Sequence, residues 1–257
     1  NVYRDLGRQE EALGAYQRAI ELDPKDATPH NGLGNVYAAM GRQEEALGAF
    51  QRAIELDPKF AYPHNGLGNV YRDLGRQEEA LGAYQRAIEL DPKVAAPHNG
   101  LGSVYRGLGR YEDALGAYQQ AIELDPKFAY PHNGLGSVYR ALGRQEEALT
   151  AYQRAIELNP KDGIYHSSLA GVYRKLGREG EAAQQIEIAR GLIAHESEYN
   201  RACFESICGN ADTALALLKT AIGISPHFRD LARHDPDFDF IRADARFIAL
   251  TAGEQAQ

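Results

Sequence analysis

The sequence has no tryptophan, one methionine and two cysteines among its 257 residues. No run of apolar residues approaches the roughly 18–20 needed to cross a bilayer, which excludes a transmembrane protein. Basic residues are also in deficit: 28 Lys and Arg stand against 36 Asp and Glu, a net charge of −8. That balance argues against binding nucleic acid through overall charge. The remaining composition, 44% apolar and 25% charged, is typical of a folded protein.

Recognisable catalytic or metal-binding patterns are missing as well. Cys203 and Cys208 lie five residues apart on one predicted helix, so their side chains diverge. This favours buried or half-buried thiols over a disulfide or a metal pair. The GLGNVYR segments follow no strand, unlike a phosphate-binding loop, and paired acids such as Glu44 and Glu45 recur along the chain as a solvated face. We therefore expect no enzymatic activity, no metal and no cofactor.

What the sequence does contain is a repeat of 34 residues, nearly identical from residue 27 to 162. One tyrosine recurs at the same position of successive repeats, and we call such a set of equivalent residues a column. The tyrosine column is Tyr3, Tyr37, Tyr71, Tyr105, Tyr139 and Tyr173. Each repeat predicts two helices. The first begins at a proline such as Pro29 and ends at the glycine before an arginine, and the second ends at an Asp-Pro pair. One helix pair cannot close a core, so stability must come from stacking on neighbouring repeats.

The positions Leu33, Gly34, Tyr37, Gly41, Ala46, Phe50, Ala53 and Pro58 and their equivalents resemble the tetratricopeptide repeat. This resemblance implies an all-α fold, an α-solenoid of stacked helix-turn-helix repeats forming a right-handed superhelix. The family's aromatic at the fourth position is replaced by His30, His64, His98, His132 and His166. Neighbouring histidines lie one repeat, roughly 10 Å, apart, too far to share a zinc ion bound at about 2 Å, so we expect them to pack in place of the aromatic.

The repeats define the expected domains. Residues 1–194 form the array, with a truncated first repeat and further repeats starting near residues 27, 61, 95, 129 and 163. Residues 195–226 form a degenerate seventh repeat. Residues 227–257 are similar to the atypical closing helices of many bacterial arrays, with helix starts at Ser225-Pro226 and Asp235-Pro236 and a frayed tail from Thr251.

The charges separate by layer. The first-helix halves of the repeats starting near 27, 61, 95, 129 and 163 carry ten basic residues and one acidic residue, whereas the second helices are acidic. In the family the first helices line the concave surface, which implies a basic groove. A stripe at i, i+4 and i+7 on these helices matches the family's peptide-holding positions. It comprises Asn31, Asn35, Asn65, Asn69, Asn99, Asn133, Ser103, Ser137, Arg72, Arg106, Arg140 and Arg174.

Asparagine can pair with a peptide backbone of any sequence, and arginine prefers carboxylates. Recent duplication explains the repetition of these polar residues equally well. Tyr62 and Tyr130, beside Phe60 and Phe128, are candidate aromatic anchors or packing residues at the joints between repeats. A further set of glycines, Gly32, Gly66, Gly100 and Gly134, lies in mid-helix, where it could leave room for a ligand backbone.

We therefore expect a non-enzymatic scaffold that binds an extended, acidic peptide of a protein partner, with neither nucleic acid nor a membrane as partner. The alternative is self-assembly through the truncated amino-terminal end of a larger protein. Binding of RNA by a helical-repeat code is a third alternative, which the acidic total disfavours. Because the chain begins at Asn1 rather than Met, we expect it to be the carboxy-terminal array of a larger bacterial protein, located in the cytoplasm.

Overall fold

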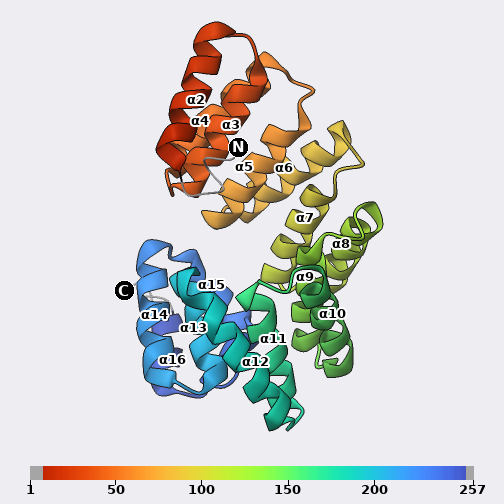
Figure 1. The fold of residues 1–257 in the computed structure, drawn as a ribbon, viewed down its shortest axis with the longest axis vertical. Coiled ribbons are helices and arrows are strands. Elements are labelled where there is room, and N and C mark those ends of the chain that lie inside the picture. Colours follow the sequence, from red (N-terminus) through yellow and green to blue (C-terminus); the bar gives the residue numbers. More distant parts are fainter. Residues whose placement is uncertain (1–7, 253–257) are drawn as a thin grey trace. The chain divides into compact units, whose positions relative to one another are not determined.

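The computed structural model describes residues 8–252, and within this range the chain is helical and has no strand. Short turns join the helices into hairpins that follow one another along the chain (Figure 1). The prediction of an all-α fold of stacked helix pairs is confirmed. The helices are α2 (Gln9–Leu22), α3 (Ala27–Ala39), α4 (Gln43–Leu56), α5 (Ala61–Asp73), α6 (Gln77–Leu90), α7 (Ala95–Gly107), α8 (Tyr111–Leu124), α9 (Ala129–Ala141), α10 (Gln145–Leu158), α11 (Gly163–Lys175), α12 (Glu179–Leu192), α13 (Glu198–Cys208), α14 (Ala211–Ile224), α15 (His227–His234) and α16 (Ala245–Thr251).

The chain divides into two compact parts, an N-terminal part, Asn1–Val104, and a C-terminal part, Tyr105–Gln257. The boundary falls within α7. In the N-terminal part α3 packs on α4 and α5 on α6, and the two hairpins meet through α4 and α5. In the C-terminal part α9 packs on α10, α11 on α12 and α13 on α14, and α10 meets α11. Each part thus shows the hairpin stacking that a single pair needs to bury its apolar face.

The first helix of a repeat begins two residues before the proline at which the sequence predicted its start. α5 begins at Ala61 and α9 at Ala129, so Pro63 and Pro131 occupy the third helical position. This position is still in the first turn, where no helical hydrogen bond requires the missing N–H. The predicted helix ends are confirmed by left-handed glycines with φ between 70° and 74°: Gly41, Gly75, Gly109, Gly143 and Gly177.

Glycines of the first helices make room for aromatic rings of the second helices. A Cβ atom on Gly66 would lie 2.4 Å from Cε1 of Phe50, and one on Gly34 would lie 2.5 Å from the same atom. Phe50 is fully buried at 1% exposure. Its ring is therefore held between a glycine of its own repeat and a glycine of the next, a spacing that an alanine would not permit.

The same arrangement surrounds Tyr84, whose ring lies against Gly68 and Gly100. The structure thus corrects the hypothesis that mid-helix glycines leave room for a ligand backbone. The space is filled by an aromatic side chain of the preceding repeat. The pairs are Gly32 with Tyr16, Gly66 with Phe50, Gly100 with Tyr84 and Gly134 with Tyr118.

The histidine column is half-buried in four repeats and buried in the next. Burial is the largest cause of a lowered pKa at each of the four half-buried side chains, His30, His64, His98 and His132. His166 is buried, and its ring nitrogens lie 2.7 Å from Gln185 Oε1 and 3.0 Å from the carbonyl oxygen of Pro160. The column therefore packs at the aromatic position, as the sequence predicted.

These lowered pKa values predict a loss of stability in mild acid. The unfolded chain takes up protons near pH 6.5, whereas the folded histidines do so only at lower pH, so stability falls as pH drops through this window. We expect the urea midpoint to decrease from about pH 7.5 to about pH 5. The double variant His64→Gln, His98→Gln should show a flatter profile, and an unchanged slope in that variant would contradict the assignment.

The C-terminal part ends in a seventh hairpin. The sixth repeat closes with the 3₁₀ turn η1 (Ile193–His195), in which Ala194 stands where earlier repeats have proline. The hairpin α13–α14 follows, and Gly209 adopts φ 83° between its helices. Its core combines Tyr199 and Leu218 with residues that come later in the chain, notably Phe238 and Phe247. The degenerate repeat is therefore completed by the segment that follows it.

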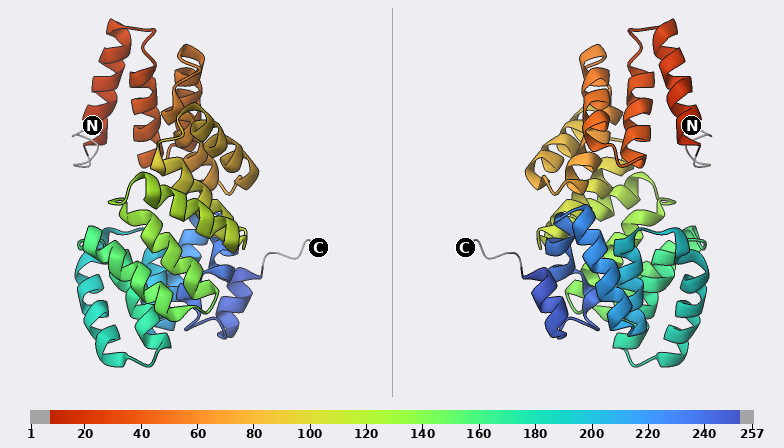
Figure 2. Two further views of the ribbon diagram at one scale, coloured as in Figure 1. Left: turned by 90° about the vertical axis from the view of Figure 1, so that its right-hand side faces the viewer. Right: turned by 90° about the vertical axis from the view of Figure 1, so that its left-hand side faces the viewer.

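After α14 the chain folds back onto the C-terminal part (Figure 2). α15 starts after Pro226, and the 3₁₀ turn η2 (Pro236–Phe238) follows Asp235, as the two predicted helix starts require. α15 and α16 pack on α14, whereas η2 contacts α13 and α9. Thr251, expected in a frayed tail, is instead buried in α16. Residues 253–257 of that tail lie outside the described residues.

Candidate peptide-binding surface

The first helices form the inner layer within each part. α3 contacts α5 in the N-terminal part, and α11 contacts both α9 and α13 in the C-terminal part. In a curved stack of hairpins, the layer whose successive helices touch one another is the inner one. The residues expected to bind a peptide come from this layer.

The asparagine and serine columns are half-buried on this layer. Their members are Asn31, Asn35, Asn65, Asn69, Asn99, Ser103, Asn133 and Ser137. The Oδ1 atoms of Asn31, Asn65 and Asn133 are buried and have no hydrogen-bond partner. Each such oxygen is a costly group to leave unpaired. These three amides therefore have hydrogen-bonding capacity that the described residues do not use.

The second polar position in the stripe supports the core. Tyr84 OH donates to Asn69 Oδ1 over 2.8 Å, and Ser137 Oγ lies 3.2 Å from Tyr152 OH. Both tyrosines are fully buried, and a buried hydroxyl needs a partner. Asn69 and Ser137 thus provide the partner for the ring that stacks on the glycines, a role that the sequence analysis did not assign.

This pairing predicts the effect of adding a hydroxyl to Phe50, which occupies the tyrosine position in the repeat that contains Asn35. Phe50→Tyr should stabilise the protein by about 0.5–1.5 kcal/mol, because the new hydroxyl can donate to Asn35. Tyr84→Phe is the matched control and should lose a similar amount at Asn69. Both are measured by urea denaturation. Destabilisation by Phe50→Tyr would show that the two repeats are not equivalent here.

Half of the basic charge of the first-helix layer lies at the turns and faces the second helices. The arginine after each left-handed glycine stacks on the tyrosine column and pairs with an acid three residues later; Arg110, for example, lies 4.4 Å from the Tyr105 ring centroid and 2.8 Å from Asp113 Oδ2. The ion pairs are Arg42–Glu45, Arg76–Glu79, Arg110–Asp113, Arg144–Glu147 and Arg178–Glu181. The basic character of the inner surface therefore rests on the remaining basic residues, Arg72, Arg106, Arg140, Arg174 and Lys175.

The four stripe arginines have different surroundings. Arg72 pairs with Asp73 on its own helix at 2.9 Å, and its side chain is 32% exposed. Arg174 donates to the carbonyl oxygen of Ile207 and lies 4.8 Å from the Phe240 ring centroid. The stripe is therefore not uniform: in the C-terminal part it contacts the chain's own end.

Arg140 makes the most buried of these contacts. Its guanidinium pairs with the Asp237 carboxylate and donates over 3.0 Å to the carbonyl oxygen of Pro236. The side chains of Arg140 and Asp237 are only 2% and 14% exposed. Burial acts to lower the pKa of Arg140, but Asp237 outweighs it and holds that pKa above its ordinary range. Burial raises the pKa of Asp237, and Arg140 opposes the rise.

Arg106 faces the same segment through a small cavity. Arg106, Ser137, His234, Asp235 and Pro236 are among the residues that line it. The Arg106 Nε atom is buried without a hydrogen-bond partner. Burial acts to lower the pKa of Arg106, and neighbouring groups that include Tyr118 and Asp235 raise it above its ordinary value. Arg106 therefore adds positive charge opposite the Asp235 carboxylate.

We call residues 235–240, with the sequence Asp-Pro-Asp-Phe-Asp-Phe, the acidic segment. Lys175 Nζ lies 3.1 Å from Asp239 Oδ2 and 5.6 Å from the Phe240 ring centroid. Together with Arg140 and Arg174, it lines the C-terminal part's inner surface along this segment. Asp237 and Asp239 pair with Arg140 and Lys175, and Phe240 lies against the same basic layer, while Phe238 enters the core.

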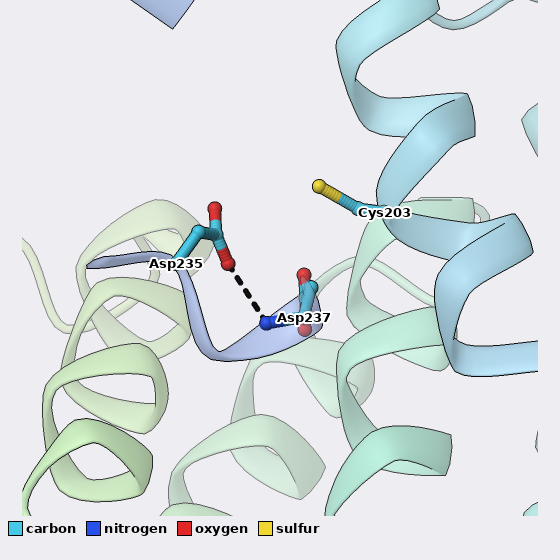
Figure 3. Close-up of side chains that lie close together, drawn as sticks. All are labelled: Cys203, Asp235 and Asp237. Atoms are coloured by element: carbon cyan, nitrogen blue, oxygen red, sulfur yellow. Dashed lines mark hydrogen bonds between the residues drawn. The ribbon is translucent and has the colours of Figure 1, made fainter. Parts of the chain in front are cut away.

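Two carboxylates of the acidic segment lie beside a thiol, as Figure 3 shows. One ligand atom from each of Cys203, Asp235 and Asp237 lies within 4.8 Å of the others. Asp235 accepts from Tyr199 OH at 3.1 Å and from the Asp237 backbone N–H at 2.9 Å, while Asp237 pairs with Arg140. Burial raises the pKa of Cys203 well above its ordinary value. A protonated thiol and carboxylates already bound by protein donors do not fit a metal site.

The aromatic pairs have one exposed member each. Tyr62 is 56% and Tyr130 57% exposed, and their rings contact Phe60 and Phe128 at centroid distances of 5.8 and 5.7 Å. Tyr130 also contacts Tyr165 edge to face at 6.2 Å. Phe60 and Phe128 are half-buried. The tyrosines therefore remain accessible while the phenylalanines pack at the joints.

Sequence reasoning missed the acidic segment as part of the site because it treated residues 227–257 as an end cover. A usable signal was present: three aspartates in six residues have the charge expected of a ligand for the basic layer. Lys175 was also missed, since it replaces an acidic or neutral residue at that repeat position.

The family comparison agrees with the hairpin stacking and the repeat spacing. The family model of the Cilia and flagella-associated protein 70 C-terminal domain, a tetratricopeptide-repeat domain, matches residues 1–203. The chain belongs to this tetratricopeptide-repeat family. No curated protein matches the sequence.

Solved tetratricopeptide-repeat structures are similar to the chain. TTC0263, a thermophilic protein of Thermus thermophilus, is 26% identical over 71% of this chain and 98% of that one, with a TM-score of 0.61. The APC/C hetero-tetramer Cut9-Hcn1 is 20% identical over 90% of this chain and 47% of that one, with a TM-score of 0.71. YrrB, described as having an unusual peptide-binding site, is 23% identical over 80% and 98%, with a TM-score of 0.51. The last two show the fold alone.

Tetratricopeptide-repeat proteins are generally non-catalytic scaffolds for protein interactions, and the fold supports this general role here. Between residues 8 and 252, no helix has the length and apolar character to span a membrane.

Proposed function

We propose that the inner surface of this tetratricopeptide-repeat array binds an extended acidic peptide of a protein partner. The observation that carries the proposal is the contact of Arg140 with the acidic segment. One guanidinium binds both a carboxylate, Asp237, and a backbone carbonyl, that of Pro236. This contact supports the proposal, because it is of the kind by which a stripe arginine would hold both the charge and the main chain of an acidic peptide.

The asparagines would supply the contacts that do not depend on peptide sequence. The unpartnered amide oxygens of Asn31, Asn65 and Asn133 can accept from a peptide N–H if the amide rotates, since rotation exchanges its oxygen and nitrogen. Exposed Tyr62 and Tyr130 would contact apolar side chains of the ligand. In this proposal the stripe arginines, including Arg72, Arg106 and Arg174, hold carboxylates.

The affinity should be modest, about micromolar or −8 kcal/mol, because ordering a free peptide offsets much of the contact energy. The test is fluorescence anisotropy of acidic and basic peptide libraries with the full chain at several salt concentrations. Acidic peptides should bind preferentially and more weakly at high salt, because exposed ion pairs are screened.

Asn31→Ala with Asn65→Ala should weaken binding at every salt concentration, because these bonds are to neutral backbone. Equal binding of acidic and basic libraries would overturn the proposal. Self-assembly through the truncated amino-terminal end is the alternative from the sequence. Sedimentation at increasing concentration distinguishes it from peptide binding.

A further inference from the structure

The acidic segment makes the contacts proposed for an external ligand. Arg140 binds Asp237 and the Pro236 carbonyl oxygen, Lys175 pairs with Asp239, and the Arg174 guanidinium lies over Phe240. The segment lies against α9 and α13, both first helices of the C-terminal part. A chain segment of the expected charge therefore already occupies the expected surface.

Further contacts with α13 and with the core fix the segment in place. Ser206 Oγ donates to the Asp237 carbonyl oxygen at 2.7 Å, and Tyr199 OH donates to the Asp235 carboxylate at 3.1 Å. Phe238 has 0% exposure and contacts Tyr199 and Phe247. An external peptide would have to remove the Phe238 side chain from the core before it could reach Arg140. The free energy of binding at micromolar affinity does not offset that cost.

The corresponding arginine of the N-terminal part has a different environment. Arg72 corresponds to Arg174, and its pair with Asp73 is on an exposed surface, where an ion pair contributes little and exchanges readily. Asn31 and Asn65 have unpartnered amide oxygens and Tyr62 is more than half exposed, as Asn133 and Tyr130 are in the C-terminal part. The arginine contacts are therefore what distinguishes the two parts.

We infer that the acidic segment is a permanent resident ligand of the C-terminal part, and that an external partner binds only to the N-terminal part. The partner's charge pattern follows from the resident, whose backbone forms the 3₁₀ turn η2: an acidic peptide in which aspartates alternate with aromatic or apolar residues. Carboxylates would pair with Arg72, and an aromatic would contact the Arg72 guanidinium or Tyr62. This inference rests on the proposed function and restricts it to one half of the array.

The test uses a fluorescein-labelled peptide with the sequence of residues 234–241, His-Asp-Pro-Asp-Phe-Asp-Phe-Ile, added to the full chain. Its control peptide has asparagine at the three aspartate positions. We expect one acidic peptide per chain, with at least tenfold weaker binding of the control peptide. Asn65→Ala with Arg72→Ala should weaken binding tenfold or more, whereas Lys175→Ala, a matched change beside the resident segment, should leave it within twofold.

Hydrogen exchange provides a readout that does not depend on the variants. Added peptide should protect amides of α3 and α5 and leave the protection of residues 235–247 unchanged. Two peptides per chain, a gain of affinity in Lys175→Ala, or faster exchange of the acidic segment would show that the segment is displaced and would overturn this inference alone. Binding of neither peptide would instead remove the proposed function on which it rests.

Discussion

Replacing Arg140 by Ala is expected to lower the free energy of unfolding by about 3–5 kcal/mol. The substitution leaves the Asp237 carboxylate buried without its cation and removes the donor to the Pro236 carbonyl oxygen. Urea denaturation measures the loss. Hydrogen exchange should locate it in the C-terminal part, at amides of α9, α13 and the acidic segment.

Arg72→Ala is the matched control, since the same residue type at the same repeat position pairs with an exposed acid. It should change stability by no more than about 1 kcal/mol. Adding Asp237→Asn to Arg140→Ala should recover part of the loss, because a neutral amide costs less to bury than a carboxylate. If Arg140→Ala and Arg72→Ala cost the same, the Arg140 pair is not buried as described.

Gly100→Ala and Gly82→Ala are expected to have opposite signs although the chemical change is the same. A Cβ atom on Gly100 would lie 2.4 Å from Cε1 and Cζ of the buried Tyr84 ring, so the helices must separate, at a cost of about 1–3 kcal/mol. Gly82, in α6, has nothing within 4 Å of its Cβ position. Alanine there should stabilise the helix by about 0.5–1 kcal/mol.

Thermal and urea denaturation of the two variants would measure both effects. Gly66→Ala repeats the test at the ring of the preceding repeat, Phe50, whose Cε1 atom would also lie 2.4 Å from the added Cβ atom. A stabilising Gly100→Ala would mean that the ring moves aside at little cost, and the account of glycine as a packing requirement would be wrong.

The fold was predictable because its signals are local and repeated. The end of each first helix follows from a glycine such as Gly41, and the end of each second helix from a pair such as Asp57-Pro58; both act on the backbone within one turn. The helix start was placed two residues late at Pro63 because proline is accepted anywhere in a first turn. This error in the helix start is small because no long-range contact determines where the helix begins.

The candidate site was less predictable because its deciding contacts join distant residues. The packing role of Gly66 depends on the Phe50 ring, which comes from another helix. Arg140 and Asp237 are 97 residues apart, and the acidic segment lies outside the periodic pattern. Counting charges by helix also did not separate Arg140 from the turn arginine Arg144. Arg144 pairs with Glu147, which faces away from the inner layer. Periodicity identifies equivalent positions, but it does not show which equivalents are already occupied.

The turn arginines affect whether the array can gain repeats by duplication. Arg42 stacks on Tyr37 and pairs with Glu45, all within one 34-residue repeat. A duplication of the whole repeat therefore adds no unmatched turn charge, and each new copy brings the glycines that receive its neighbour's ring. The repeats from residue 129 onward are different, because Arg140, Lys175 and Ser206 are committed to the acidic segment. Insertion of a repeat among them would break that register, so we expect duplication of a whole repeat to cost less stability before residue 129 than after it.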